Sequence, residues 1–108
     1  MSKKHTAIVL AAGKGSRMQS AVPKQYLELC GKPVLYYSLA AFEESFVDEI
    51  ILVTGKDDIS YCKEQIVERY GFQKVTKIIA GGAERYLSVY QGLLAAEEAD
   101  YVYIHDGA

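Results

Sequence analysis

The feature that most constrains the fold is a set of four short, near-continuous apolar runs separated by longer amphipathic segments. The runs cover residues 6–10, 49–54, 75–79 and 101–105. Strands of this kind are typical of a parallel sheet that is buried on both faces and joined by right-handed crossovers. We therefore expect an α/β fold, a parallel sheet with flanking helices. At 108 residues the chain is one domain at most.

The segments between the runs have the spacing of amphipathic helices. Their apolar stripes are Leu35, Leu39 and Phe42 within 34–44, then Ile59, Cys62 and Ile66 within 59–70, then Leu87, Tyr90 and Leu94 within 84–98. Pro33 suits the first turn of the first helix, because the N–H that proline lacks would have no partner within the helix at that position. Gly71 suits the end of the second helix.

Residues that could bind a ligand follow the strands. Ligands of parallel sheets bind outside the carboxyl ends of the strands. In this chain, the segments at those ends are the loop after Leu10, the pair Gly81-Gly82, and Asp106. Glycines in residues 11–18 would let backbone N–H groups approach a phosphate. The loop is not a P-loop, and Met18 stands where a dinucleotide fingerprint has its third glycine. A plain turn without a ligand is the alternative interpretation.

Positive charge is concentrated near the N-terminus. The net charge of −2 argues against general nucleic-acid binding, yet residues 1–32 carry six basic side chains and one acidic one, a balance of +5. Arg17 offers a planar fork to phosphate oxygens, and Lys24 offers a compact charge. Together they could clamp a polyanion. The alternative is that these cations, with Lys14, are solvated surface charges.

The cysteines and the hydropathy pattern indicate a cellular compartment. Cys30 and Cys62 form no CxxC motif and no Cys/His cluster, so we expect reduced, buried thiols rather than a disulfide or a zinc site. No apolar run approaches the ~18 residues of a membrane span, and the N-terminus has no signal-peptide core. We expect a cytoplasmic protein that binds neither membrane nor nucleic acid.

Four motifs, in order along the chain, resemble a known enzyme family. They are LAAGKGSRM at 10–18, PKQYLEL with GKPVL at 23–35, GGAER with SV at 81–89, and YIHDGA at 103–108. The chain resembles the N-terminal segment of the 2-C-methyl-D-erythritol 4-phosphate cytidylyltransferase family, which acts in non-mevalonate isoprenoid biosynthesis. The resemblance implies a Rossmann-like sheet of nucleotidyltransferase type, here incomplete. Residues 1–108 would be the nucleotide-binding N-terminal part of a single cytidylyltransferase domain.

The resemblance also implies a role for each residue of a nucleotide site. Arg17 and Lys24 would be the catalytic cations at the triphosphate, and Asp106 would hold Mg²⁺, which favours carboxylate and phosphate oxygens. CTP would be bound by Ala11, Ala12, Gly13, Gly15, Gly82, Ala83 and Ser88. Without the resemblance, Ser88 reads as a helical serine facing solvent or a carbonyl, Arg85 as an exposed or loop-bracing cation, and Asp106 as a helix N-cap.

The implied reaction is an in-line attack by the acceptor phosphate on the α-phosphorus of CTP, releasing pyrophosphate. An ionised phosphomonoester needs no general base, so we interpret His105 as structural and the nine tyrosines mostly as packing residues. Two other functions stay open, a ribitol-5-phosphate cytidylyltransferase and a non-catalytic CTP-binding module. We expect a homodimeric full-length parent, and a 108-residue chain with little turnover alone and an uncovered sheet edge.

Overall fold

The four apolar runs form the four strands of one sheet. In the computed structural model, which describes residues 3–12, 26 and 28–107, the strands are β1 (His5–Ala11), β4 (Glu49–Thr54), β5 (Val75–Ala80) and β6 (Tyr101–Asp106). All neighbouring strands are parallel, in the order β5-β4-β1-β6. The predicted α/β class and all four predicted strands are therefore confirmed.

Burial divides the sheet into a central pair and two edges. Every residue of β4 is buried, as is β1 after its first residue, whereas β5 and β6 are partly exposed. The expectation of burial on both faces is wrong for β6, where Tyr101 is 50% and Ile104 42% exposed. No described strand pairs with the outer side of β6, which agrees with the expected open edge.

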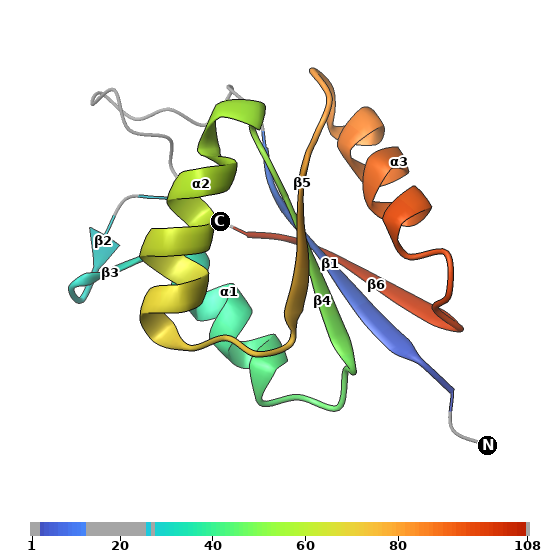
Figure 1. Cartoon of the computed structure of the whole chain (residues 1–108), viewed down its shortest axis with the longest axis horizontal. Coiled ribbons are helices and arrows are strands. Elements are labelled where there is room, and N and C mark those ends of the chain that lie inside the picture. The colour runs from blue at the N-terminus through green and yellow to red at the C-terminus, as the bar shows by residue number, and fades with distance from the viewer. Residues whose placement is uncertain (1–2, 13–25, 27, 108) are drawn as a thin grey trace.

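Helices cover both faces of the sheet, as Figure 1 shows. One face carries α1 (Val34–Glu43) and the continuous segment of α2 (Ile59–Cys62) and η3 (Lys63–Glu68), which follows the 3₁₀ turn η2 (Lys56–Asp58). The other face carries α3 (Arg85–Ala95). No helix among the described residues is long and apolar enough to cross a membrane.

The first two helical patterns are confirmed, with one difference in geometry. Leu35, Leu39, Cys62 and Ile66 are fully buried. Within the second helix, residues 63–68 have π-helical hydrogen bonding, which the sequence pattern did not distinguish because a spacing of four residues suits either kind of turn. The helix ends at Gly71 as predicted, with φ of +70° and the Phe72 N–H donating to the Val67 carbonyl at 3.0 Å.

The predicted buried stripe of α3 is wrong. Leu87, Tyr90 and Leu94 are 36%, 55% and 52% exposed, while Ser88 and Gly92 are buried on the opposite side of the helix. A Cβ added to Gly92 would lie only 2.7 Å from Cγ2 of Ile8 on β1. Small residues therefore form the inner face of α3 and let the helix lie very close to the sheet.

A two-stranded ribbon that the sequence analysis did not predict precedes α1. Strands β2 (Glu28–Leu29) and β3 (Lys32–Pro33) pair antiparallel, and Cys30 and Gly31 between them have φ of 54° and 82°. Positive φ at both central residues is typical of a type I′ hairpin turn. The turn exposes Cys30, so its expected burial is wrong, and Pro33 immediately precedes α1 instead of lying in its first turn.

Cys62 is a buried, reduced thiol, as the sequence predicts. Cys62 is fully buried, neither cysteine is in a disulfide, and burial raises the pKa of the Cys62 thiol to about 11. A hydrogen bond at 3.3 Å joins the thiol to the hydroxyl of Tyr26, and this bond opposes part of that rise in pKa. The thiol is therefore protonated near pH 7 and behaves as a packing group.

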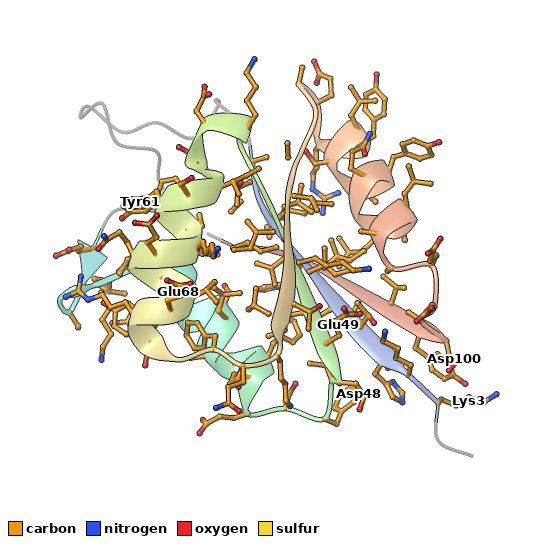
Figure 2. The ribbon with its side chains drawn as sticks, viewed as in Figure 1. Lys3, Asp48, Glu49, Tyr61, Glu68 and Asp100 are labelled. Atoms are coloured by element: carbon orange, nitrogen blue, oxygen red, sulfur yellow. The ribbon has the colours of Figure 1, made fainter. Side chains whose placement is uncertain are left out.

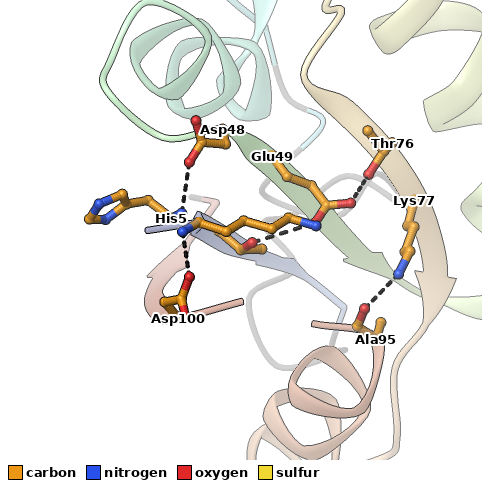
Figure 3. Close-up of polar contacts among 9 residues, drawn as sticks. His5, Asp48, Glu49, Thr76, Lys77, Ala95 and Asp100 are labelled. Atoms are coloured by element: carbon orange, nitrogen blue, oxygen red, sulfur yellow. Dashed lines mark hydrogen bonds and ion pairs between the residues drawn. The ribbon is translucent and has the colours of Figure 1, made fainter. Parts of the chain in front are cut away.

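A polar network ties the amino ends of the strands together (Figure 3). The buried carboxylate of Glu49 on β4 lies 3.1 Å from Nζ of Lys4, and it accepts hydrogen bonds from Thr6 Oγ1 at 3.4 Å and from Thr76 Oγ1. Burial raises the pKa of Glu49, but the Thr76 hydroxyl and the Lys4 ammonium more than offset this, so the pKa lies below its ordinary value. The network therefore favours a charged Glu49 in the folded chain.

Candidate nucleotide site at the carboxyl ends of the strands

The order of the strands identifies where a ligand would bind. From β1 the chain runs to β4 and β5 on one side, and then returns to β6 on the other side of β1. Such a reversal of strand order between neighbouring strands is a topological switch point, and the crevice beyond the strand ends there is the usual ligand site of open α/β sheets. Here the switch point lies between β1 and β6, at the end opposite the Glu49 network.

Asp106 lies directly beside this crevice. It is the last residue of β6, in register with Leu10 of β1, and the next residue, Gly107, donates its N–H to the Leu10 carbonyl at 2.8 Å. The hydrogen bond extends the β1–β6 pairing to the end of β6 and so fixes the backbone that carries Asp106. Its side chain is 60% exposed at the ligand edge.

The loop after β5 is held against the end of β1. Gly81 donates its N–H to the carbonyl of Thr54 at 2.8 Å, which continues the pairing of β4 with β5. A Cβ added to Gly81 would lie 2.9 Å from Val53 Cγ1 and 3.0 Å from the Cβ of Ala12, and would also collide with Ser88 Oγ. Only glycine allows the loop, the end of β1 and α3 to approach this closely.

Ser88 stabilises the same loop from α3. Its side chain is buried, and its Oγ accepts a hydrogen bond from the N–H of Gly82 at 3.2 Å. The isolated interpretation of Ser88 as a serine facing solvent or a carbonyl is wrong, since it accepts an amide proton in the interior. Ser88 therefore positions the backbone of residues 81–83 at the ligand edge.

Asp106 has a charged partner that links β6 to α3. Arg85 Nε lies 3.2 Å and Nη2 3.5 Å from the two carboxylate oxygens of Asp106. Both side chains are about 60% exposed, so water screens the pair and it contributes roughly 0–1 kcal/mol to stability. Arg85 is exposed, as one of the two sequence interpretations predicted, and its partner is a strand residue and not a loop. This contact, which the sequence did not predict, keeps a guanidinium at the mouth of the crevice.

In the described part of the chain, the candidates lie at or just after the carboxyl ends of three strands, except Ser88, which contacts Gly82 from α3. These candidates are Ala11 and Ala12 at β1, Gly82 and Ala83 after β5, and Asp106 at β6. The remaining candidates Gly13, Gly15, Arg17 and Lys24 lie outside the described residues. His105, on the same strand as Asp106, has its ring 5.6 Å from that of Phe42 on α1, in agreement with a packing role.

The chemistry of these side chains fits a magnesium ion held jointly with a nucleotide. Among the described residues no group of three or more His, Cys, Asp or Glu side chains could hold a metal. Mg²⁺ commonly takes one or two carboxylates and completes its shell with phosphate oxygens and water. The single exposed carboxylate of Asp106 suits that arrangement and does not suit a metal site made of protein ligands alone.

The chain matches a known protein family. The family model described as 2-C-methyl-D-erythritol 4-phosphate cytidylyltransferase matches residues 5–108. The chain belongs to this family. Curated cytidylyltransferases of this name from Lachnoclostridium phytofermentans and Lachnospira eligens are each 61% identical to it, over 106 and 105 residues. These matches cover 98% and 96% of the chain and 46% of each relative, so the chain spans about half the length of the cytidylyltransferases that it matches.

Solved structures agree with the cytidylyltransferase fold. The 4-diphosphocytidyl-2C-methyl-D-erythritol synthase of Anaerococcus prevotii is 36% identical, with a TM-score of 0.77 over 97% of this chain and 43% of its own. A nucleotidyl transferase from Methanothermobacter has a TM-score of 0.68 at 26% identity, over 96% of this chain and 50% of its own. The chain thus shares its parallel sheet and flanking helices with both solved structures.

Proposed function

We propose that the chain is the nucleotide-binding part of a CTP-dependent cytidylyltransferase. The whole protein transfers CMP from CTP to 2-C-methyl-D-erythritol 4-phosphate and releases pyrophosphate. The observation that carries the proposal is that Asp106 ends β6 beside β1 at the switch point, while Gly81, the neighbour of Gly82, packs against Ala12 at the end of β1. The names and high identity of the curated relatives support the choice of nucleotide and acceptor.

The backbone around residues 11–12 and 81–83 would bind the cytidine base. Ala11, Ala12, Gly82 and Ala83 have no polar side chains, so only main-chain N–H and C=O groups are available to pair with the edge of a base. Ser88 holds the Gly82 amide, and Gly81 leaves no spare volume beside Ala12. We expect a base that pairs with this backbone to be a pyrimidine, because the small residues bring the main chain close to it and leave no room for a purine.

The cations of the N-terminal segment would neutralise the negative charge of the triphosphate. Gly13, Gly15, Arg17 and Lys24 supply backbone donors and two positive side chains for the triphosphate. The acceptor phosphate attacks the α-phosphorus in line, and Arg17 and Lys24 stabilise the charge that develops on the departing pyrophosphate. Asp106 would hold Mg²⁺, which when bound neutralises phosphate charge. No general base is required, since the acceptor is already ionised.

Two further properties complete the proposal for the whole protein. We assign it to the cytoplasm, and we expect it to work as a homodimer. The homodimer follows from the family resemblance alone, and the location follows from the cysteine and hydropathy patterns of the sequence. Native mass spectrometry of the full-length protein tests the dimer.

Pyrophosphate release tests the proposal directly. The full-length protein should release pyrophosphate from CTP only when 2-C-methyl-D-erythritol 4-phosphate is present, and ribitol 5-phosphate should not replace it. Lys24→Ala should lower kcat far more than it weakens CTP binding. Equal rates with ribitol 5-phosphate would refute the assigned acceptor, and an unchanged kcat would refute the role of Lys24.

A further inference from the structure

Asp106, the proposed magnesium ligand, has a cationic partner to which the proposed function gives no role. Arg85, the first residue of α3, has Nε 3.2 Å and Nη2 3.5 Å from the two carboxylate oxygens. Both backbones are fixed by other contacts. The N–H of Gly107 is bonded to the Leu10 carbonyl beside Asp106, and the Ser88 hydroxyl holds the loop that leads into α3. The fold therefore keeps two opposite charges together at the ligand edge of the sheet.

The Arg85–Asp106 pair does little for the stability of the fold. Its side chains are 62% and 60% exposed, so water screens their attraction. The first turn of α3 holds no acidic residue, and a cation at the first position of a helix opposes the helix dipole. The Lys4–Glu49 pair at the amino ends of the strands is different, because the side chain of Glu49, which Figure 2 labels, is only 9% exposed. The position of the Arg85 pair beside the crevice therefore points to binding.

A carboxylate at this edge opposes the ligand that we propose. CTP carries a triphosphate, and like charges that lie close together repel, most strongly where water is partly excluded. Mg²⁺ relieves this repulsion when it is shared between the carboxylate and phosphate oxygens. When no metal is bound, the relief has to come from a cation of the chain, and the Arg85 guanidinium lies against the Asp106 carboxylate.

We propose that Arg85 is a positioning residue that acts through Asp106: its guanidinium neutralises the carboxylate when no metal is bound, and yields it to the Mg²⁺ of a Mg-CTP complex. The exposure of both side chains permits this exchange, since solvent and ions reach the pair. The inference rests on the proposed function. It adds that the first residue of α3 sets how strongly nucleotide binding depends on the metal.

Calorimetric titration of the chain with CTP, in EDTA and at saturating Mg²⁺, tests the inference. Arg85→Ala should weaken CTP binding in EDTA by about threefold to tenfold, because Asp106 then repels the triphosphate. At saturating Mg²⁺ its affinity should stay within about twofold of wild type, since the metal neutralises the carboxylate there. Arg85→Lys keeps the charge and should retain most of the affinity in EDTA. Cytidine, which has no phosphates, should bind every variant equally.

Two further variants separate the charge of Arg85 from a bracing role. Adding Asp106→Asn to Arg85→Ala removes the carboxylate that repels the triphosphate, and should restore CTP binding in EDTA to the wild-type value. Arg69→Ala removes another exposed cation, directly after Glu68, which Figure 2 labels on η3, and should leave CTP binding unchanged. Urea unfolding of each variant shows whether the chain remains folded.

Each outcome has one meaning. Equal losses for Arg85→Ala in EDTA and in Mg²⁺ would mean that Arg85 contacts the nucleotide itself, and a loss for cytidine would mean that it braces the loop. Either result, an unchanged affinity in EDTA, or no recovery with Asp106→Asn would overturn the inference while leaving the proposed function intact. A folded wild-type chain that binds neither cytidine nor CTP would contradict the proposed nucleotide site, and the inference with it.

Discussion

Ser88 Oγ accepts the backbone N–H of Gly82 at 3.2 Å, and this bond joins α3 to the loop that follows β5. The acceptor is buried, so a variant without it leaves an amide donor unsatisfied. The loop backbone is also the surface that we assign to cytidine. The bond therefore connects the stability of the fold with the affinity for nucleotide.

Replacing Ser88 should weaken nucleotide binding. Ser88→Ala removes the acceptor of the Gly82 N–H, and we expect the affinity for CTP to fall by about fivefold or more, equivalent to about 1 kcal/mol. Calorimetric titration measures the change. Ser60→Ala, on the exposed side of α2, is the matched control and should bind CTP as the wild type does.

Asp106 should matter for the metal and not for folding. Asp106→Asn keeps the shape and removes the charge of a side chain that is 60% exposed, so its unfolding free energy should stay within about 0.5 kcal/mol of wild type. In the full-length protein, pyrophosphate release should require far more Mg²⁺ and be at least about a hundredfold slower. Asp57→Asn, on the exposed turn η2, is the control. A normal Mg²⁺ dependence in Asp106→Asn would refute the metal role.

Gly92 should not tolerate a methyl group. Gly92→Ala gains roughly 0.5–1 kcal/mol of helix propensity, but its Cβ would meet Ile8 Cγ2 at 2.7 Å, and overpacking of this kind costs about 1–3 kcal/mol. We expect a net loss in the free energy of unfolding, measured by urea denaturation. The exposed neighbour Gln91 provides the control, since Gln91→Ala adds nothing to the interface. A stabilised Gly92→Ala would mean that α3 lies farther from the sheet.

The Glu49 network should make the fold sensitive to acid. The pKa of the Glu49 carboxyl is lower in the folded chain than in the unfolded chain. Glu49 therefore contributes to the free energy of unfolding above its ordinary pKa of 4.5, and this contribution is lost as the pH falls through the folded-state pKa. We expect the free energy of unfolding to decline below about pH 4.5 in the wild type. Glu49→Gln should cost about 1–2 kcal/mol at pH 7 and flatten this acid-side decline. An unchanged acid-side slope in Glu49→Gln would show that other carboxylates cause it.

The sheet was predictable from the sequence because a parallel strand buried on both faces needs an apolar run, whatever its neighbours are. The same rule places Asp106 and Gly82 at one edge, since the carboxyl ends of parallel strands meet there. The site candidates that lie in the described residues were identified in this way and through their family motifs.

The contacts within the site could not be predicted from the pattern. The large residues Leu87, Tyr90 and Leu94 set the predicted face of α3, yet the close approach to the sheet selects Ser88 and Gly92 for the inside. A stripe of small residues at a spacing of four was the available signal. The pairing of Arg85 with Asp106 depends on how α3 lies on the sheet, which no local pattern specifies.

Titration of the chain with CTP and with ATP, each with and without Mg²⁺, tests the central claim most directly. We expect that CTP binds, that Mg²⁺ tightens its binding, and that ATP binds far more weakly because the backbone of residues 11–12 and 81–83 is proposed to recognise a pyrimidine. Equal affinity for the two nucleotides, or no binding of either by a folded chain, would contradict it.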